Sequence, residues 1–182
     1  MSENKKIRCL FYVTPKFKWK YLVNWAITIW TWCRYSHVEL WVPDEDSGFT
    51  NLPSSCFVGY RGTCYSSTMR GSDNGTRKAD ASLVLKHPEN WEYIEIAVTD
   101  EQYATLMLNM NWEVAHNKGY AMRDILKFIS PIHFPDNNRF ICSEFCYEML
   151  GNIGVLKDCG IISPKKLYKK LIAVGYKVEK LV

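Results

Sequence analysis

The sequence predicts an α+β domain in which an antiparallel sheet packs against helices. Two segments alternate between apolar and polar residues, HVELWV at residues 37–42 and WEYIEIAV at residues 91–98, which is typical of strands with one face toward a core. Helical segments with clear end signals stand before and after the strands. With 182 residues, 47% of them hydrophobic and 23% charged, the chain is expected to form one domain over residues 1–182.

The N-terminal part is expected to begin with a strand and a helix. Residues 7–13 are an apolar run, which predicts a buried strand. Residues 18–33 are rich in aromatic side chains and predict a helix. Its apolar run at 21–33 is shorter than the about 20 residues that cross a bilayer, so we expect it to face the core. A position on a membrane surface is the alternative.

A hairpin and a loop are expected after strand 37–42. Residues 56–60 and 63–67 are expected to pair across a turn at Arg61-Gly62. Residues 67–80 are rich in Ser, Gly, Asn and Asp, which predicts a mobile loop beside a site. Basic side chains in and next to it are expected to be solvated or to meet an anionic substrate group: Arg70, Arg77 and Lys78.

The C-terminal half is expected to be mainly helical after strand 91–98. A capping box at Thr99 and Gln102 predicts a helix that ends near His116, before Gly119. The remaining expected elements are helices at 121–129, 142–150 (closed by Gly151) and 165–173 (opened by Ser163 and Pro164), and a strand at 176–181.

Charge and cysteine content narrow the classes of function. The net charge is +4, from 23 Lys and Arg against 19 Asp and Glu, without a dense basic block, so nucleic acid is not an expected partner. The seven cysteines are odd in number and scattered, which favours a reducing compartment, the cytoplasm, over a disulfide framework. The start of the chain is polar and its first apolar run is short, so no secretory signal is expected.

Cys142 and His37 are the candidates for catalysis. Cys142 stands at the start of a predicted helix, where N–H groups and the helix dipole favour a thiolate and can receive an oxyanion. His37 lies on strand 37–42, on the same face as Glu39. A cysteine and a histidine far apart in sequence but joined in space form the usual thiol hydrolase site. Simple packing roles for both residues are the alternative.

The cysteines also raise the question of a metal. Cys146 follows Cys142 by one helical turn, and the two could bind zinc together with His37 or His133. The second ligand pair of ordinary zinc sites is missing, so no metal or cofactor is expected. The cysteines other than Cys142 are expected to pack in the core.

Four short motifs in this order resemble the circularly permuted NlpC-like group of papain-fold proteins: YSHVEL at 35–40, CYSS at 64–67, ICSEF at 141–145 and SPKKLY at 163–168. The group includes YiiX-like proteins, the lecithin–retinol acyltransferase family, and small phage and viral proteins. Its histidine motif precedes its cysteine motif, as here. For a phage-encoded member, the cytoplasm would be that of the host.

The resemblance implies a permuted papain-like fold, with the histidine on the sheet and the nucleophile at the N-terminus of a helix. It also implies attack on an amide, ester or thioester carbonyl through an acyl-enzyme, with Cys142 as nucleophile and His37 as general base. Expected substrates are peptides, cell-wall amides and lipid esters.

The residue that orients His37 is open between Glu39 and Ser66. The resemblance places this residue on the next strand, near Ser66, where the family has His, Glu, Asn or Gln; serine orients imidazole weakly. Glu39 shares the face of His37, although strand neighbours two residues apart diverge. We expect Glu39 to hold the role, because its carboxylate otherwise has no evident partner.

The expected function is a thiol hydrolase of the amidase, peptidase or esterase type. One alternative is a lipid-directed acyltransferase that works at a membrane surface through the helix at 18–33. The other is a binding protein that keeps a papain-like cleft without turnover, which the weak third position favours.

Overall fold

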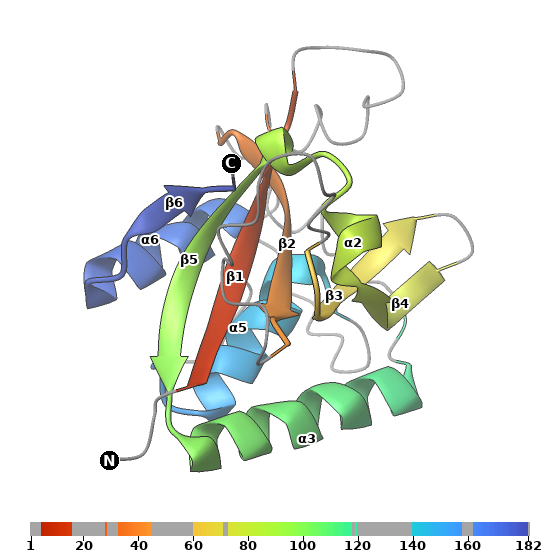
Figure 1. Ribbon diagram of the computed structural model, residues 1–182, viewed down its shortest axis with the longest axis vertical. Helices are drawn as coiled ribbons and strands as arrows, with labels where there is room; N and C mark the ends of the chain where they lie inside the picture. Colours follow the sequence, from red (N-terminus) through yellow and green to blue (C-terminus); the bar gives the residue numbers. More distant parts are fainter. Residues whose placement is uncertain are drawn as a thin grey trace, which may run out of the picture.

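The computed structural model describes residues 5–15, 28, 33–44, 60–70, 73–117, 119, 140–157 and 162–181. Their fold is α+β: a six-stranded antiparallel sheet of order β4-β3-β2-β1-β5-β6 with four helices packed against it (Figure 1). The strands are β1 (Lys5–Val13), β2 (Tyr35–Val42), β3 (Thr63–Arg70), β4 (Asp73–Asp80), β5 (Trp91–Val98) and β6 (Val178–Lys180). The helices are α2 (Ala81–Val84), α3 (Asp100–His116), α5 (Cys142–Asn152) and α6 (Pro164–Val174), and a short 3-10 helix, η2 (Pro88–Asn90), precedes β5.

Strand β1 lies in the interior of the sheet, between β2 and β5. It pairs antiparallel with both, and its pairing with β5 is continuous from Lys5–Val98 to Tyr12–Trp91. Every side chain from Ile7 to Tyr12 is buried. The apolar run at the start of the sequence is thus explained by burial on both faces of the sheet.

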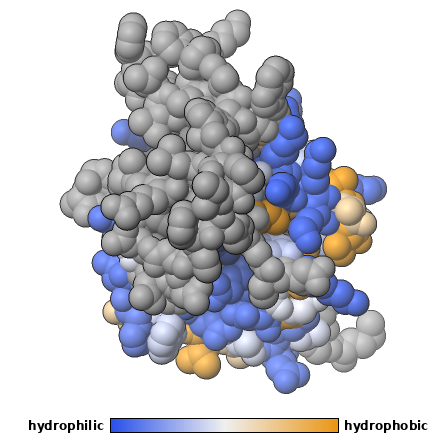
Figure 2. Space-filling view, turned by 180° about the vertical axis from the view of Figure 1, so that it is seen from behind, coloured by the Kyte–Doolittle hydropathy of each residue, from blue (hydrophilic) through white to orange (hydrophobic). Residues whose placement is uncertain are grey.

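The two faces of the sheet carry separate clusters of buried residues. On one face, the helix side, Phe11 and Leu40 pack with residues of α3, α5 and α6. On the other face, the α2 side, Leu10 and Trp41 pack with Ala81 of α2. Figure 1 shows α5 behind the strands and α2 in front of them. Figure 2 views the helix side from outside, where the described surface is mostly hydrophilic.

The N-terminal capping interactions predicted for two helices, α3 and α6, are confirmed. The Thr99 hydroxyl accepts a hydrogen bond from the Gln102 N–H, and the Gln102 side chain accepts one from the Thr99 N–H, so the capping box before α3 is present. Before α6 the Ser163 hydroxyl accepts from the Lys166 N–H, with Pro164 in the first turn. Strand β5 also has the predicted bounds.

The loop predicted for residues 67–80 is wrong, because β3 and β4 pair there as a hairpin. Two polar side chains of this segment, Ser67 and Thr76, are buried and hydrogen-bonded, whereas Asn74 and Asp80 are exposed. Thr76 donates to the Glu113 carbonyl of α3 at 2.7 Å, and Ser67 donates to the Phe140 carbonyl at 2.8 Å. Polar side chains whose hydrogen bonds are satisfied fit a buried strand.

Other boundaries also differ from the predictions. Strand β3 pairs with β2 and with β4. The strand predicted at 56–60 as its hairpin partner lies outside the described residues, apart from Tyr60. Helix α5 continues through Gly151 to Asn152. The helices predicted at 18–33 and 121–129 lie outside the described residues, apart from Thr28 and Cys33. Within the described ranges, no helix is long and apolar enough to cross a membrane.

Gly62 enables the close approach of the chain to the end of β2. Its φ is +115°, and a Cβ at this position would lie 2.2 Å from the Val42 carbonyl oxygen. We expect Gly62→Ala to lower the free energy of unfolding by about 2 kcal/mol or more, because both the backbone and the contact are strained. Gly151→Ala is the control, since the nearest atom there is 3.9 Å away in a helix. Urea unfolding measures both, and equal stability of the two variants would contradict the argument.

Candidate active site

His37 and Glu39 project to the α2 side of the sheet. Directly paired residues of antiparallel strands share a face, and here His37 pairs with Tyr12 and Glu39 with Leu10 of the α2-side cluster. The His37 ring also contacts the Trp91 ring, with centroids 6.5 Å apart. His37 is 5% exposed and Glu39 only 1%. The prediction that alternation sets both residues on one face of this strand is therefore confirmed.

Two buried side chains, His37 and Glu39, and the half-buried Arg77 form a row on this face, the His37–Glu39–Arg77 row. His37 Nε2 lies 3.0 Å from Glu39 Oε1, and Arg77 Nη2 lies 3.1 Å from the same oxygen. Arg77 comes from β4, where it pairs with Ser66 of β3. A buried carboxylate needs cationic or hydrogen-bonding partners, so Arg77 favours the ionised form of Glu39.

The row determines which imidazole nitrogen can act as a base. An ionised carboxylate only accepts hydrogen bonds, so the 3.0 Å contact requires Nε2 of His37 to carry a hydrogen and donate it to Glu39. In the neutral ring Nδ1 is then the basic nitrogen. The arrangement can hold one tautomer and stabilise the imidazolium when Nδ1 takes a proton.

Ser66 lies beside the row without joining it. It pairs with Arg77 and is 1% exposed, yet its hydroxyl forms no hydrogen bond with the described residues. Of the two candidates for orienting His37, only Glu39 contacts the imidazole. The expected divergence of strand neighbours two residues apart is overcome because the glutamate side chain is long enough to lie back along the strand.

Cys142 is the first residue of α5, as predicted. The chain is extended at Ile141, whose N–H donates to the Glu144 carboxylate at 3.2 Å, so the helix begins with a local cap. Ser143 donates to the Ile162 carbonyl, which ties the start of α5 to the start of α6. Cys142 itself is 4% exposed.

The N-terminus of α5 lies near the position in the sheet where the pairing of β2 with β3 ends. We call this position the parting of β2 and β3. These strands pair only from Leu40–Tyr65 to Val42–Thr63, although β2 begins at Tyr35 and β3 ends at Arg70. Next to this parting, the carbonyl just before α5 receives the hydrogen bond from Ser67 of β3. This hydrogen bond joins the chain just before α5 to the part of β3 that does not pair with β2.

Cys142 and His37 come from elements on opposite faces of the sheet. Helix α5 packs on the helix side of the sheet, whereas His37 projects to the α2 side. Among the described residues, no hydrogen bond joins the Cys142 thiol to the imidazole. The structure thus brings together His37 and Glu39, adds Arg77, and places Cys142 at the start of a helix that packs on the other face of the sheet.

Three of the other described thiols are buried, and Cys33 is half-buried. Burial raises the pKa of Cys9, Cys64 and Cys146 above the ordinary value for cysteine. For Cys64, which lies on the α2 side, the Glu39 carboxylate adds to the rise and Arg77 opposes it. The prediction that these three pack in the core is confirmed. Cys56, Cys159 and His133 lie outside the described residues, among which no group of three metal-ligating side chains is found.

Arg77 is the site residue that sequence reasoning missed as a partner of Glu39. It was assigned to a loop, where it was expected to be solvated or to meet a substrate anion. The signal that pointed to it was the glutamate itself, because a carboxylate on a buried strand requires a cation from elsewhere in the chain.

Comparison with known proteins found no protein-family model that matches this chain, and no match among curated proteins.

We expect Arg77→Met to lower the free energy of unfolding by about 3 kcal/mol, because it removes a cation from a buried carboxylate. Adding Glu39→Gln should restore a large part of this loss, since the amide carries no charge. Lys78→Met, at the exposed neighbouring position of β4, is the control and should change stability by less than about 0.5 kcal/mol. Denaturant unfolding of these three variants and of Glu39→Gln alone completes the double-mutant cycle. A loss in Arg77→Met that Glu39→Gln leaves unchanged would show that the two residues do not depend on each other.

Proposed function

We propose that this protein is a thiol-nucleophile hydrolase with a permuted papain-like fold, acting on acyl bonds through Cys142 and His37. The observation that carries the proposal is the His37–Glu39–Arg77 row, with a cysteine at the start of α5 on the other face of the sheet. The order of the histidine and cysteine motifs supports the same assignment. The proposed substrates are peptides, cell-wall amides or lipid esters.

The energetics of the row support a chemical role. Moving charges out of water costs several kcal/mol for each ion, and replacing a buried ion pair by apolar residues is often neutral or stabilising. The row is therefore a weak source of stability. Shifted or paired ionisable groups in such surroundings are typical of catalytic sites, where an imidazole must be oriented and its cation stabilised.

The proposed reaction begins with transfer of the Cys142 thiol proton to Nδ1 of His37, while Glu39 stabilises the imidazolium through Nε2–H. The thiolate attacks the carbonyl carbon, and the oxyanion is received by backbone N–H groups of the first turn of α5. The imidazolium then protonates the leaving group, and the C–S acyl-enzyme forms. Water, deprotonated by Nδ1, cleaves that bond and returns the thiol.

A second candidate is a binding protein that keeps the site without turnover. The specific observation in its favour is that the Cys142 thiol makes no hydrogen bond to His37 among the described residues. Hydrolysis requires the sulfur to reach Nδ1 through the parting of β2 and β3. A binding protein does not require the sulfur to reach the imidazole.

The first test is the reactivity of the thiols toward iodoacetamide at neutral pH. We expect Cys142 to be alkylated faster than the other six thiols, and His37→Ala to slow its alkylation about tenfold, because the imidazole raises the thiolate fraction. Cys33, which is half-buried, serves as the internal reference and should keep its rate in the variant. Mass spectrometry maps each site with time. Faster labelling of Cys146, or a Cys142 rate indifferent to His37, would remove the assigned pair.

The second test separates Glu39 from Ser66 by hydrolysis of p-nitrophenyl acetate. We expect Cys142→Ala and His37→Ala to abolish the acyl-enzyme burst. Glu39→Gln should lower the rate by about a hundredfold and move the acidic limb of the pH profile, because an amide stabilises imidazolium poorly. Ser66→Ala should stay within about threefold of wild type, since its hydroxyl has no hydrogen bond to lose.

Two other results of that experiment have clear meanings. Damage by Ser66→Ala with a silent Glu39→Gln would assign the orienting role to Ser66. No burst in the wild-type protein, with all variants folded, would favour the binding protein.

A further inference from the structure

Helix α3 exposes large apolar side chains on the side that faces away from the sheet. Leu108 is 70% exposed and Trp112 is 50% exposed. Side chains four residues apart are neighbours on a helix, so these two form one surface. Ala104 and Ala115 are exposed as well and continue this surface toward the two ends of the helix. We call these four residues the α3 stripe.

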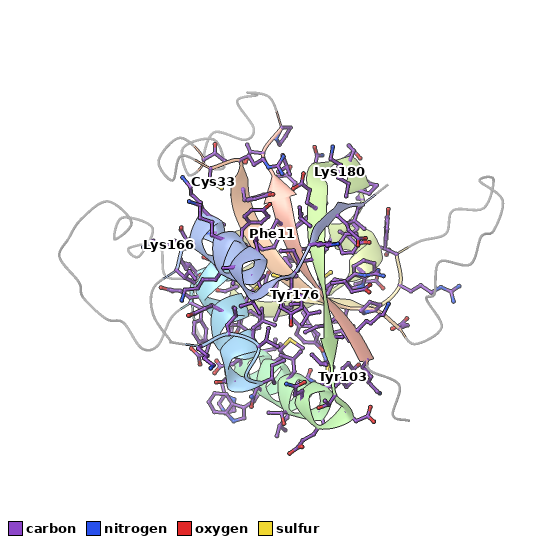
Figure 3. The ribbon with its side chains drawn as sticks, turned by 90° about the vertical axis from the view of Figure 1, so that its left-hand side faces the viewer. Phe11, Cys33, Tyr103, Lys166, Tyr176 and Lys180 are labelled. Carbon is purple, nitrogen blue, oxygen red and sulfur yellow. The ribbon has the colours of Figure 1, made fainter. Side chains whose placement is uncertain are left out.

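The opposite side of α3 makes the contacts of this helix with the core. Leu106 and Met110 are completely buried, and Tyr103 packs against the same core cluster (Figure 3). Figure 1 shows α3 along the lower edge of the molecule. A surface helix ordinarily carries charged and polar side chains on its outward face, yet residues 102–112 include no charged residue. A contiguous apolar surface in this position is typical of a contact with another protein.

The Trp112 ring is already held in place on this surface. It stacks on the His116 ring, with centroids 3.9 Å apart, and the Nδ1–H of His116 donates to the Trp112 carbonyl oxygen at 2.8 Å. Tryptophan is enriched among the residues that contribute most to the binding free energy of interfaces. A ring that is fixed before binding loses little conformational entropy when a partner covers it. The α3 stripe therefore has the properties of a protein-binding surface.

The charges of α3 select among the partners. The helix has no lysine or arginine, and its first turn holds Asp100 and Glu101. Nucleic acids and anionic membranes attract basic side chains, so neither fits this helix. A second copy of the chain fits it in the antiparallel direction. Two parallel α3 helices would bring their acidic first turns together, whereas antiparallel helices keep these turns apart and place each of them toward His116 of the other copy.

The α3 stripe is also complementary to itself about Leu108. When a two-fold axis passes through this position, each residue of α3 meets the residue that lies equally far on the other side of Leu108 in the second copy. Ala104, four residues before Leu108, then faces Trp112, four residues after it. The small side chain leaves space for the large one, as the close packing of helices requires.

We propose that this protein forms a two-fold symmetric dimer in which α3 packs antiparallel against α3 of a second copy. Leu108 lies on the axis, and Ala104 of each copy lies opposite Trp112 of the other. One helix from each copy makes the contact, so its area is at the low end for specific interfaces, and we expect a Kd on the order of 10 µM. The proposal does not depend on turnover at Cys142.

The test is sedimentation velocity of the full chain at neutral pH, over protein concentrations below and above this Kd. We expect a monomer–dimer equilibrium for the wild-type protein. Leu108→Glu should be a monomer at every concentration, because it places two carboxylates next to each other at the axis. The matched control is Leu83→Glu, which makes the same change at a leucine of α2 that is 75% exposed. It should keep the wild-type Kd within about twofold.

Two further variants test the antiparallel arrangement. Ala104→Trp sets two large side chains opposite each other and should weaken the dimer about tenfold or more. Adding Trp112→Ala exchanges the large and the small side chain across the axis and should restore most of the affinity. All substituted positions are exposed, and circular dichroism checks that each variant is folded.

Four results would each overturn the proposal. The first is a wild-type protein that is a monomer at every concentration, which would leave the α3 stripe to a different partner. The second is a dimer that Leu108→Glu leaves intact, and the third is an equal loss in Leu83→Glu. The fourth is a double variant of Ala104 and Trp112 that dimerises no better than Ala104→Trp alone.

Discussion

Burial of the Glu39 carboxylate is the constraint on which the surrounding structure depends. A charge at 1% exposure in an interior strand requires a cation, and the cation comes from β4. Arg77 can reach Glu39 only if β3 and β4 pair as a hairpin beside β2. That hairpin in turn buries Ser67 and Thr76, whose hydroxyls find backbone carbonyls just before α5 and in α3. One buried charge therefore connects three strands with the helices behind them.

The same constraint links the fold to the proposed chemistry. With Arg77 on one side of Glu39 and His37 on the other, the imidazole is held in a defined orientation without any help from Ser66. Within the part of the chain that the structure describes, β2 before Leu40 and β3 after Tyr65 do not pair with each other. A nucleophile at the start of α5 and a base on β2 would approach each other at this position from the two faces of the sheet. This arrangement agrees with the motifs, in which a histidine on a strand precedes a cysteine at a helix start.

The sequence predicted those features that depend on nearby residues. The bounds of β5, the capping box at Thr99 and the start of α6 at Ser163 follow from side chains within a few positions of one another. The common face of His37 and Glu39 follows from simple alternation. The β3–β4 hairpin was missed because its polar residues have partners far away in sequence: Thr76 bonds to Glu113, and Arg77 to Glu39. The point where β2 and β3 stop pairing also depends on such long-range pairing, whereas the contact of Glu39 with His37 joins residues two positions apart and could be expected from the sequence.

The interior position of β1 has a consequence for synthesis of the chain. Its partners in β5 are far downstream; Arg8 and its ion-pair partner Glu95 are 87 residues apart. While the ribosome adds those residues, β1 has at most one neighbour, and its other edge is open to pairing with a second nascent chain. Lys5, Lys6 and Arg8 lie on that edge, and charged side chains on an open strand oppose such pairing. Two of these residues, Lys6 and Arg8, later bind Glu95 in the native sheet, and so they also protect the chain before the sheet exists.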